Sequence, residues 1–202
     1  MKRIGLPALI ASTIGPVQSI LGWVISGSLW PGYDPVRRTI SDLAADDSPV
    51  QAVQTSFFYL GATLTIIGAI YARSLALPGR ILLFGAGLAT YALAFFTTPS
   101  QVGHSDAHRI AATISFVLMS AWPLFSMRFD RRYSWVLRPV GAISATGLLT
   151  LISIWFLTSW LDPNSGNVGL TERVIVTAQV LWLSATIWVS WLQQRRLSDD
   201  LE

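Results

Sequence analysis

The chain has 202 residues, of which 52% are hydrophobic and only 12% charged, whereas soluble domains carry about a quarter of their residues as Asp, Glu, Lys or Arg. Together with a mean hydropathy of +0.51, this composition excludes an ordinary soluble domain and predicts a multi-pass membrane protein. The net charge is +3, but the basic residues are scattered, which excludes a nucleic-acid-binding patch, and the absence of cysteine excludes disulfides and thiolate chemistry.

Six windows without Asp, Glu, Lys, Arg or His divide the chain, and each is at least 18 residues long. Because an ionised side chain is costly at the bilayer centre and about 20 apolar residues span it, each window predicts one transmembrane helix. We therefore expect an all-α fold in which residues 1–202 form one domain, a six-helix transmembrane bundle. The expected helices lie at approximately 6–30, 50–72, 80–98, 107–128, 137–160 and 171–193.

The distribution of Lys and Arg predicts the orientation of these helices. The strips on one side of the membrane collect ten basic residues, and those on the other side collect four. Since cytoplasmic loops retain positive charge during insertion, we expect a plasma-membrane protein with both termini in the cytoplasm. The first helix lacks a clear small-x-small cleavage site, so we expect it to remain in the protein.

The first outer strip, residues 31–50, predicts a short amphipathic helix on the membrane surface. Asp34 followed by Pro35 is typical of a helix start, and Val36, Ile40 and Leu43 then share one helical face. The opposite face would present four polar residues, which are Arg37, Arg38, Ser41 and Asp42.

The second outer strip contains both histidines of the chain, His104 and His108. A His-x-x-x-His spacing places two imidazoles on one helical face, where they can hold a metal ion or serve as bases. If Ser105 caps this helix, however, His104 lies outside it and the two rings need not converge. An earlier cap at Thr98 would keep both on the helix, and the sequence leaves both alternatives open.

The third outer strip opens the sixth helix with Glu172 and Arg173. A carboxylate in the first turn of a helix is favoured by the helix dipole, so capping alone explains Glu172. Arg173 lies at the membrane boundary and either extends towards the headgroups or is paired inward.

Three motifs resemble, in matching order, the bacterial membrane family described as domain of unknown function 998. They are Tyr-x-Pro with Ile-Ser-Asp-Leu in residues 33–43, Gly-His-x-x-x-His-x-x-Ala-Ala from Gly103, and Gly-Leu-x-Glu-Arg-Val from Gly169. The resemblance covers essentially the whole chain and implies a six-helix fold with a polar cluster at the outer face, but no activity. The matching polar residues are Ser41, Asp42, His104, His108, Glu172 and Arg173.

A fainter resemblance is to the membrane hydrolase superfamily that includes the alkaline ceramidases and the adiponectin-receptor relatives. It rests on a Ser, an Asp and the His-x-x-x-His pair, and it implies zinc at the membrane boundary. The chain departs from that pattern because it has six expected helices rather than seven and no third histidine. Zinc would need His104, His108 and a carboxylate such as Asp42 or Glu172, with water as the fourth ligand.

These features favour a non-catalytic ligand-binding or accessory protein whose partners are the lipid bilayer and an anionic lipid or small molecule at the outer leaflet. The alternative is a zinc-dependent hydrolase or lipid-modifying enzyme. In it His104, His108, Asp42 and Ser41 would be catalytic, and the first three would hold the metal. The candidate ligand-binding residues are Arg37, Arg38, Glu172 and Arg173. Transport is a weaker alternative because the six windows lack ionisable residues.

Overall fold

The computed structural model of the chain describes residues 3–100 and 103–199, which are all-helical and contain no strand. Seven α-helices and one short 3-10 helix, η1, form the described part. They are α1 (Leu6–Ser28), α2 (Ile40–Leu43), α3 (Gln51–Tyr71), α4 (Leu77–Phe95), α5 (Asp106–Phe125), η1 (Trp135–Leu137), α6 (Pro139–Leu161) and α7 (Val168–Asp199).

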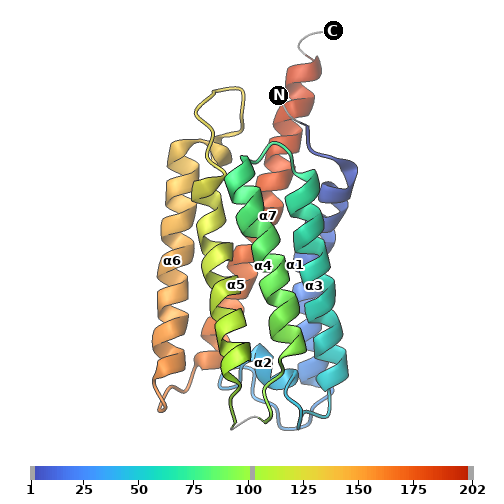
Figure 1. Ribbon diagram of the computed structural model, residues 1–202, viewed down its shortest axis with the longest axis vertical. Coiled ribbons are helices and arrows are strands. Elements are labelled where there is room, and N and C mark those ends of the chain that lie inside the picture. The colour runs from blue at the N-terminus through green and yellow to red at the C-terminus, as the bar shows by residue number, and fades with distance from the viewer. Residues whose placement is uncertain (1–2, 101–102, 200–202) are drawn as a thin grey trace.

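The six long helices stand side by side along the longest axis, and α2 lies at one end of them (Figure 1). Contacts between neighbours follow the order α1, α3, α4, α5, α6 and α7, and α7 returns to α1. The start of α1 and the end of α7 lie at the opposite end of the bundle from α2 (Figure 1). We call these two ends of the bundle the α2 end and the terminal end.

Five of the long helices, α1, α3, α4, α6 and α7, are long and apolar enough to cross a membrane. Large apolar side chains lie on the outside of the bundle, with Val140 80% and Leu151 66% exposed, whereas Ala62, Ala86 and Ala142 are fully buried. This arrangement suits lipid, because lipid tails are as apolar as leucine and small residues let helices approach closely. The chain is therefore a multi-pass helical membrane protein.

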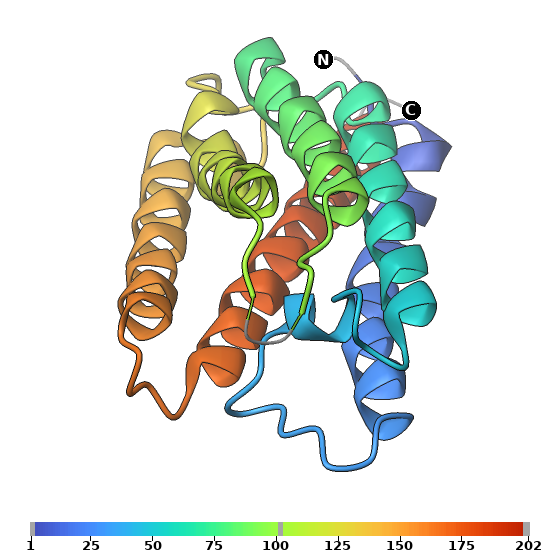
Figure 2. The same cartoon turned by 60° about the horizontal axis from the view of Figure 1, so that its bottom comes forward.

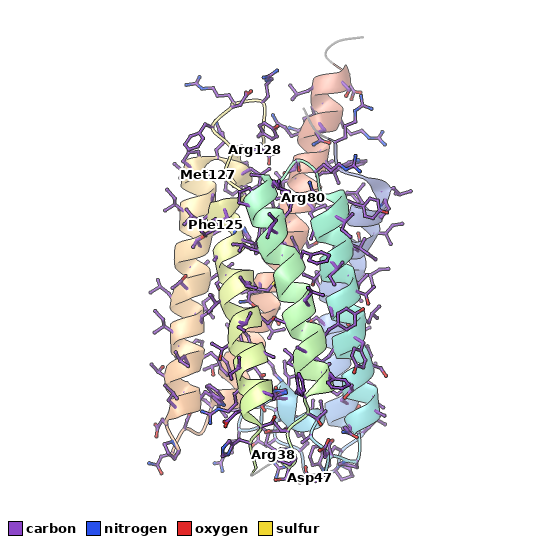
Figure 3. All side chains as sticks on the ribbon, viewed as in Figure 1. Arg38, Asp47, Arg80, Phe125, Met127 and Arg128 are labelled. Atoms are coloured by element: carbon purple, nitrogen blue, oxygen red, sulfur yellow. The ribbon has the colours of Figure 1, made fainter. Side chains whose placement is uncertain are left out.

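Arginines at the terminal end satisfy the last carbonyls of α3 and of the turn that follows it. Arg80 donates to the carbonyl oxygens of Ala69 and Ile70, each at 2.7 Å. Arg128 donates to those of Ser74 and Leu75, at 3.1 and 3.0 Å. Figure 3 shows Arg80 and Arg128 at this end and Arg38 and Asp47 at the α2 end. The labelled charged side chains thus lie at the two ends of the bundle, away from its apolar middle.

The helix in the loop between α1 and α3 is shorter than the amphipathic helix that the sequence predicts. The Asp34 side chain accepts a hydrogen bond from the backbone nitrogen of Val36 at 2.9 Å, but the residues that follow form a turn and not a helix. The helix itself begins at Ile40, and Val36 is 43% exposed. In residues 34–39, the carbonyl groups of Pro35, Val36 and Arg38 accept hydrogen bonds from Arg173 and Leu170 of α7 rather than from a helix of their own.

We expect Gly141 and Gly147, both in α6, to respond oppositely to alanine. A Cβ at Gly141 would lie 2.4 Å from the carbonyl oxygen of Trp135, whereas one at Gly147 would meet nothing within 4 Å. Gly141→Ala should lower the free energy of unfolding by about 1–3 kcal/mol through overpacking. Gly147→Ala should leave it unchanged or raise it by up to about 1 kcal/mol. Thermal unfolding in detergent measures both, and equal melting temperatures would contradict the close packing of η1 on α6.

Candidate functional site

The guanidinium of Arg173 joins the first turns of α7 to the loop before α2. The side chain is buried, and its Nη1 donates to the carbonyl oxygens of Pro35, Arg38 and Gly169 at 2.8, 2.9 and 2.9 Å. Its Nη2 donates to the hydroxyl oxygen of Tyr33 at 2.5 Å. A charged group that is removed from water needs such acceptors, and the loop supplies them from its backbone.

Two aromatic rings complete the surroundings of this cation. The guanidinium carbon lies 5.2 Å from the ring centroid of Trp23 and 5.6 Å from that of Tyr33, at distances typical of cation–π contacts. The Tyr33 hydroxyl donates to the carbonyl oxygen of Thr39 at 2.7 Å. Burial raises the pKa of this hydroxyl, against the opposing effect of Arg173, so the phenol keeps the proton that it donates.

The start of α7 also contacts the loop through its backbone. Leu170 donates from its backbone nitrogen to the carbonyl oxygen of Val36 at 3.0 Å. A Cβ at Gly169 would lie 2.0 Å from the carbonyl oxygen of Arg38, so only glycine fits there. The buried carboxylate of Glu172 accepts a hydrogen bond from the backbone nitrogen of Ile40, the first residue of α2. Glu172 therefore holds α2 against α7.

Asp42 belongs to the capping box of α2. The Thr39 nitrogen donates to the Asp42 carboxylate at 2.9 Å, and the Asp42 nitrogen donates to the Thr39 hydroxyl oxygen at 3.1 Å. Burial raises the pKa of Asp42, although the hydrogen bonds to Thr39 and the charges of Arg38 and Arg173 oppose the shift.

His108, on the first turn of α5, joins α2 to α4. Its Nδ1 lies 2.9 Å from the carbonyl oxygens of both Leu93 and Phe96, near the end of α4. Its Nε2 lies 3.1 Å from the hydroxyl oxygen of Ser41. The imidazole is only 5% exposed, so it is held between these partners. Figure 2 shows how the loop carries α2 between the ends of the long helices.

His104 does not join this group. The side-chain oxygen of Ser105 accepts from the backbone nitrogen of His108 at 3.3 Å and caps α5. His104 therefore lies outside the helix, exposed, with its Nε2 4.0 Å from the Asp106 carboxylate. Of the two caps that the sequence leaves open, the structure has the one that separates the imidazoles.

The metal ligands suggested by the sequence are not assembled. Across residues 3–100 and 103–199, no group of three His, Asp or Glu side chains is placed to hold a metal ion. The physical reason is that each candidate ligand has another partner. The ring of His108 faces Ser41 and the α4 carbonyls, and the carboxylates of Asp42 and Glu172 bond to the backbone at the start of α2. His104, His108 and Asp42 as they stand do not fit a zinc ion.

The two loop arginines contact other groups of the loop and of the chain just before it. Arg37 is exposed and lies 3.7 Å from the Asp34 carboxylate. The guanidinium of Arg38 lies 5.4 Å from the ring centroid of Trp30, at the α2 end. The structure thus brings Ser41 to His108, whereas neither Arg37 nor Arg38 lines a cavity described below.

Sequence reasoning missed several residues of this region. Thr39 was detectable, because Thr-x-x-Asp is the spacing of a capping box. Tyr33 lies in a motif but was given no role, and nothing in the sequence connects Trp23 with Arg173. Nothing in the sequence connects Arg109 with Trp160 either, yet its guanidinium lies 4.7 Å from the ring centroid of that tryptophan.

A groove of about 860 Å³ runs between α5 and α6. Polar residues line its α2 end, and apolar side chains line the remainder together with a few Ser and Thr. Val117, Ile154 and Leu157 on its walls are 58%, 51% and 44% exposed, so the groove opens on the lateral surface of the bundle. The polar lining residues at the α2 end are Thr39, Ser41, Asp42, Thr98, His104, His108, Arg109 and Glu172.

A second cavity, of about 150 Å³, lies among α1, α3, α4, α5 and α7. Gln18, Gln54 and Gln179 line it within the bundle. Four residues line both this cavity and the groove and therefore lie where the two meet, namely Ser41, Ala112, Phe116 and Glu172.

In a comparison with protein families, the model described as protein of unknown function (DUF998) matches residues 13–189. The comparisons with curated proteins and with solved structures found no match.

Replacing Arg173 by lysine should destabilise the protein. An ammonium on a flexible stem cannot contact three carbonyl oxygens and a tyrosine hydroxyl at once, so buried acceptors lose their donor. We expect Arg173→Lys to lower the free energy of unfolding by about 3 kcal/mol. The matched variant Arg37→Lys changes an exposed pair and should cost less than about 0.5 kcal/mol. Thermal unfolding in detergent tests both, and similar effects would contradict the anchoring role of Arg173.

Asp42 should make stability depend on pH. Because its pKa is raised in the folded protein, the folded chain binds this proton more tightly than the unfolded chain. The contribution of Asp42 to the free energy of unfolding therefore falls as pH rises above about 4, until the carboxyl is ionised in both states. Asp42→Asn keeps an oxygen acceptor for Thr39 but cannot ionise. Its melting temperature should thus fall less between pH 4 and pH 7 than that of the wild type, and parallel curves would contradict this origin.

Proposed function

The chain belongs to the family described as protein of unknown function (DUF998). From the geometry of the groove between α5 and α6, we propose that the protein binds an amphiphilic ligand of the outer leaflet there. One observation carries this proposal, namely the separation of polar and apolar lining along a groove that opens sideways. Its volume of about 860 Å³ lies within the range of about 300–1,000 Å³ that is usual for small-molecule sites.

The lining matches the two parts of an amphiphile. At the α2 end the groove offers the charged or polar groups of Asp42, His104 and Arg109. Farther along α5 and α6 its walls carry Phe116 and Phe156, whose ring centroids are 5.1 Å apart. A headgroup placed at the α2 end would leave its chain against this apolar wall and next to the surrounding lipid.

We infer an anionic headgroup from Arg109. This residue supplies a guanidinium to the groove lining and is held against Trp160 on the opposite wall, which reduces the conformational entropy lost on binding. Among the residues in the described part of the chain, Arg37, Arg38 and Arg173 line neither cavity. Arg109 therefore takes the ligand-binding role that the sequence suggested for these three arginines.

The proposal includes six membrane crossings with cytoplasmic termini. Helix α5 has 20 residues and stands alongside the five apolar helices, and its charged residues Asp106 and Arg109 lie in its first turn. Positive charge is more frequent in the strips that join the helices at the terminal end. By the positive-inside rule this end faces the cytoplasm, so the polar end of the groove faces the outer leaflet.

Lipid retention tests the proposed function. The purified full-length protein in detergent is given an equal mixture of phosphatidylglycerol and phosphatidylcholine, and native mass spectrometry counts the retained lipids. We expect the wild type to prefer phosphatidylglycerol. Arg109→Gln should weaken that preference about tenfold through the loss of one charge-assisted contact. Arg73→Gln, at an exposed site between α3 and α4, is its matched control.

A bulky substitution tests the place of binding. Thr150→Trp puts an indole into the groove, whereas Ile143→Trp changes an exposed position of the same helix that lines neither cavity. Retention should fall in the first variant and remain in the second. Equal retention of both lipids by all variants would show that the groove binds no anionic amphiphile.

A further inference from the structure

The protonation of His108 follows from its partners. Carbonyl oxygens only accept hydrogen bonds, so the two that lie 2.9 Å from Nδ1 require that this nitrogen carries the proton. In the neutral ring Nε2 then has a lone pair in the ring plane, and the atom that it faces is the Ser41 hydroxyl oxygen at 3.1 Å. The hydroxyl therefore donates to Nε2.

This arrangement is that of an activated serine. A hydroxyl within hydrogen-bond reach of a base, whose second nitrogen is oriented by a third group, defines a nucleophile and its general base. Here the carbonyl oxygens of Leu93 and Phe96 orient the imidazole, a role that a carboxylate has in serine hydrolases with a Ser-His-Asp triad. They also carry partial negative charge that favours the imidazolium formed when the base takes a proton.

The position of Ser41 suits an ester of an amphiphile. Ser41 is half-buried and lines the groove at the polar end. The apolar part of the groove, which includes Phe116 and Phe156, begins next to it. In a lipid, the acyl ester lies where the polar headgroup meets the hydrocarbon chain. A lipid with its headgroup near Arg109 and its chain along Phe116 would bring this linkage towards Ser41.

We propose that Ser41 is a nucleophile and His108 its general base, and that together they hydrolyse an acyl ester of the amphiphile bound between α5 and α6. The inference rests on the proposed binding function and adds a reaction to it. It requires no metal ion, unlike the zinc-dependent alternative that the sequence suggested.

In the first step the Ser41 oxygen forms a bond to the ester carbonyl carbon while its proton passes to Nε2 of His108. The tetrahedral intermediate collapses, the bond to the alcohol oxygen breaks, and the leaving alcohol takes the proton from Nε2. Water then attacks the acyl-Ser41 ester and gives a proton to the same nitrogen. Collapse releases the carboxylic acid and returns that proton to the Ser41 oxygen, so one ester and one water yield an alcohol and an acid.

A purely structural pair would show no such chemistry, and covalent labelling separates the two cases. The full-length protein in detergent is treated with a long-chain alkyl fluorophosphonate, and the modified residue is mapped by tandem mass spectrometry. We expect one adduct, on Ser41 of the wild type. Because mapping uses the wild-type protein, the result does not depend on how a variant folds. An adduct on another serine, or none, overturns the inference.

Variants and a substrate complete the test. Ser41→Ala should abolish both the adduct and the release of fatty acid from phosphatidylglycerol, and His108→Gln should slow both at least about a hundredfold. Ser144→Ala, at an exposed position of α6 that lines neither cavity, should react as the wild type does.

The outcomes distinguish this inference from the proposed binding function. If the wild-type protein retains phosphatidylglycerol but forms no adduct at Ser41, the hydrolase inference fails and the binding function stands. If Ser41 is labelled in a protein that retains no phosphatidylglycerol, the nucleophile is supported and the proposed ligand is wrong.

Discussion

The burial of the Arg173 guanidinium is the constraint on which the α2 end of the bundle depends. A guanidinium keeps its charge at any physiological pH, so inside the protein it needs several acceptors in fixed directions. Pro35 and Arg38 supply carbonyl oxygens as acceptors from a segment that forms neither helix nor sheet. The loop is thereby fixed on α7, and α2 follows it to a place between the ends of the long helices (Figure 2). Without this cation the loop carbonyls would lose their donor.

The same contacts that hold the loop also build the candidate site. Glu172 bonds to the first residue of α2, and the next residue of that helix, Ser41, meets His108. In the bilayer such polar groups are tolerated only when they satisfy one another or lie at a boundary with water. The cluster does both, since it lies at one end of an apolar bundle and lines a groove that opens between α5 and α6. The side chains that hold α2 in place are thus the same ones that form the candidate site.

The sequence predicted the helical class, but it did not predict which polar side chains contact one another. His104 and His108 are four residues apart, a spacing that favours a shared face only if the helix begins before both. In the structure the helix begins after His104, because the side chain of Ser105, which lies between the two histidines, caps α5. The periodicity of Val36, Ile40 and Leu43 predicted a longer surface helix, but the carbonyl groups of Pro35, Val36 and Arg38 accept from Arg173 and Leu170 of α7 instead. In both places a contact outside the local pattern outweighed the propensity of that pattern.

By itself the sequence determined that the chain is an all-helical, multi-pass membrane protein, because each helix that crosses a bilayer must be long and apolar in its own right. Its motifs also determined that it belongs to the DUF998 family. Only the tertiary structure decided which polar groups meet. Ser41 and His108 are 67 residues apart in the chain, and Arg173 is 138 residues from Pro35. Partners at such separations are chosen by the packing of whole helices, which no local spacing encodes.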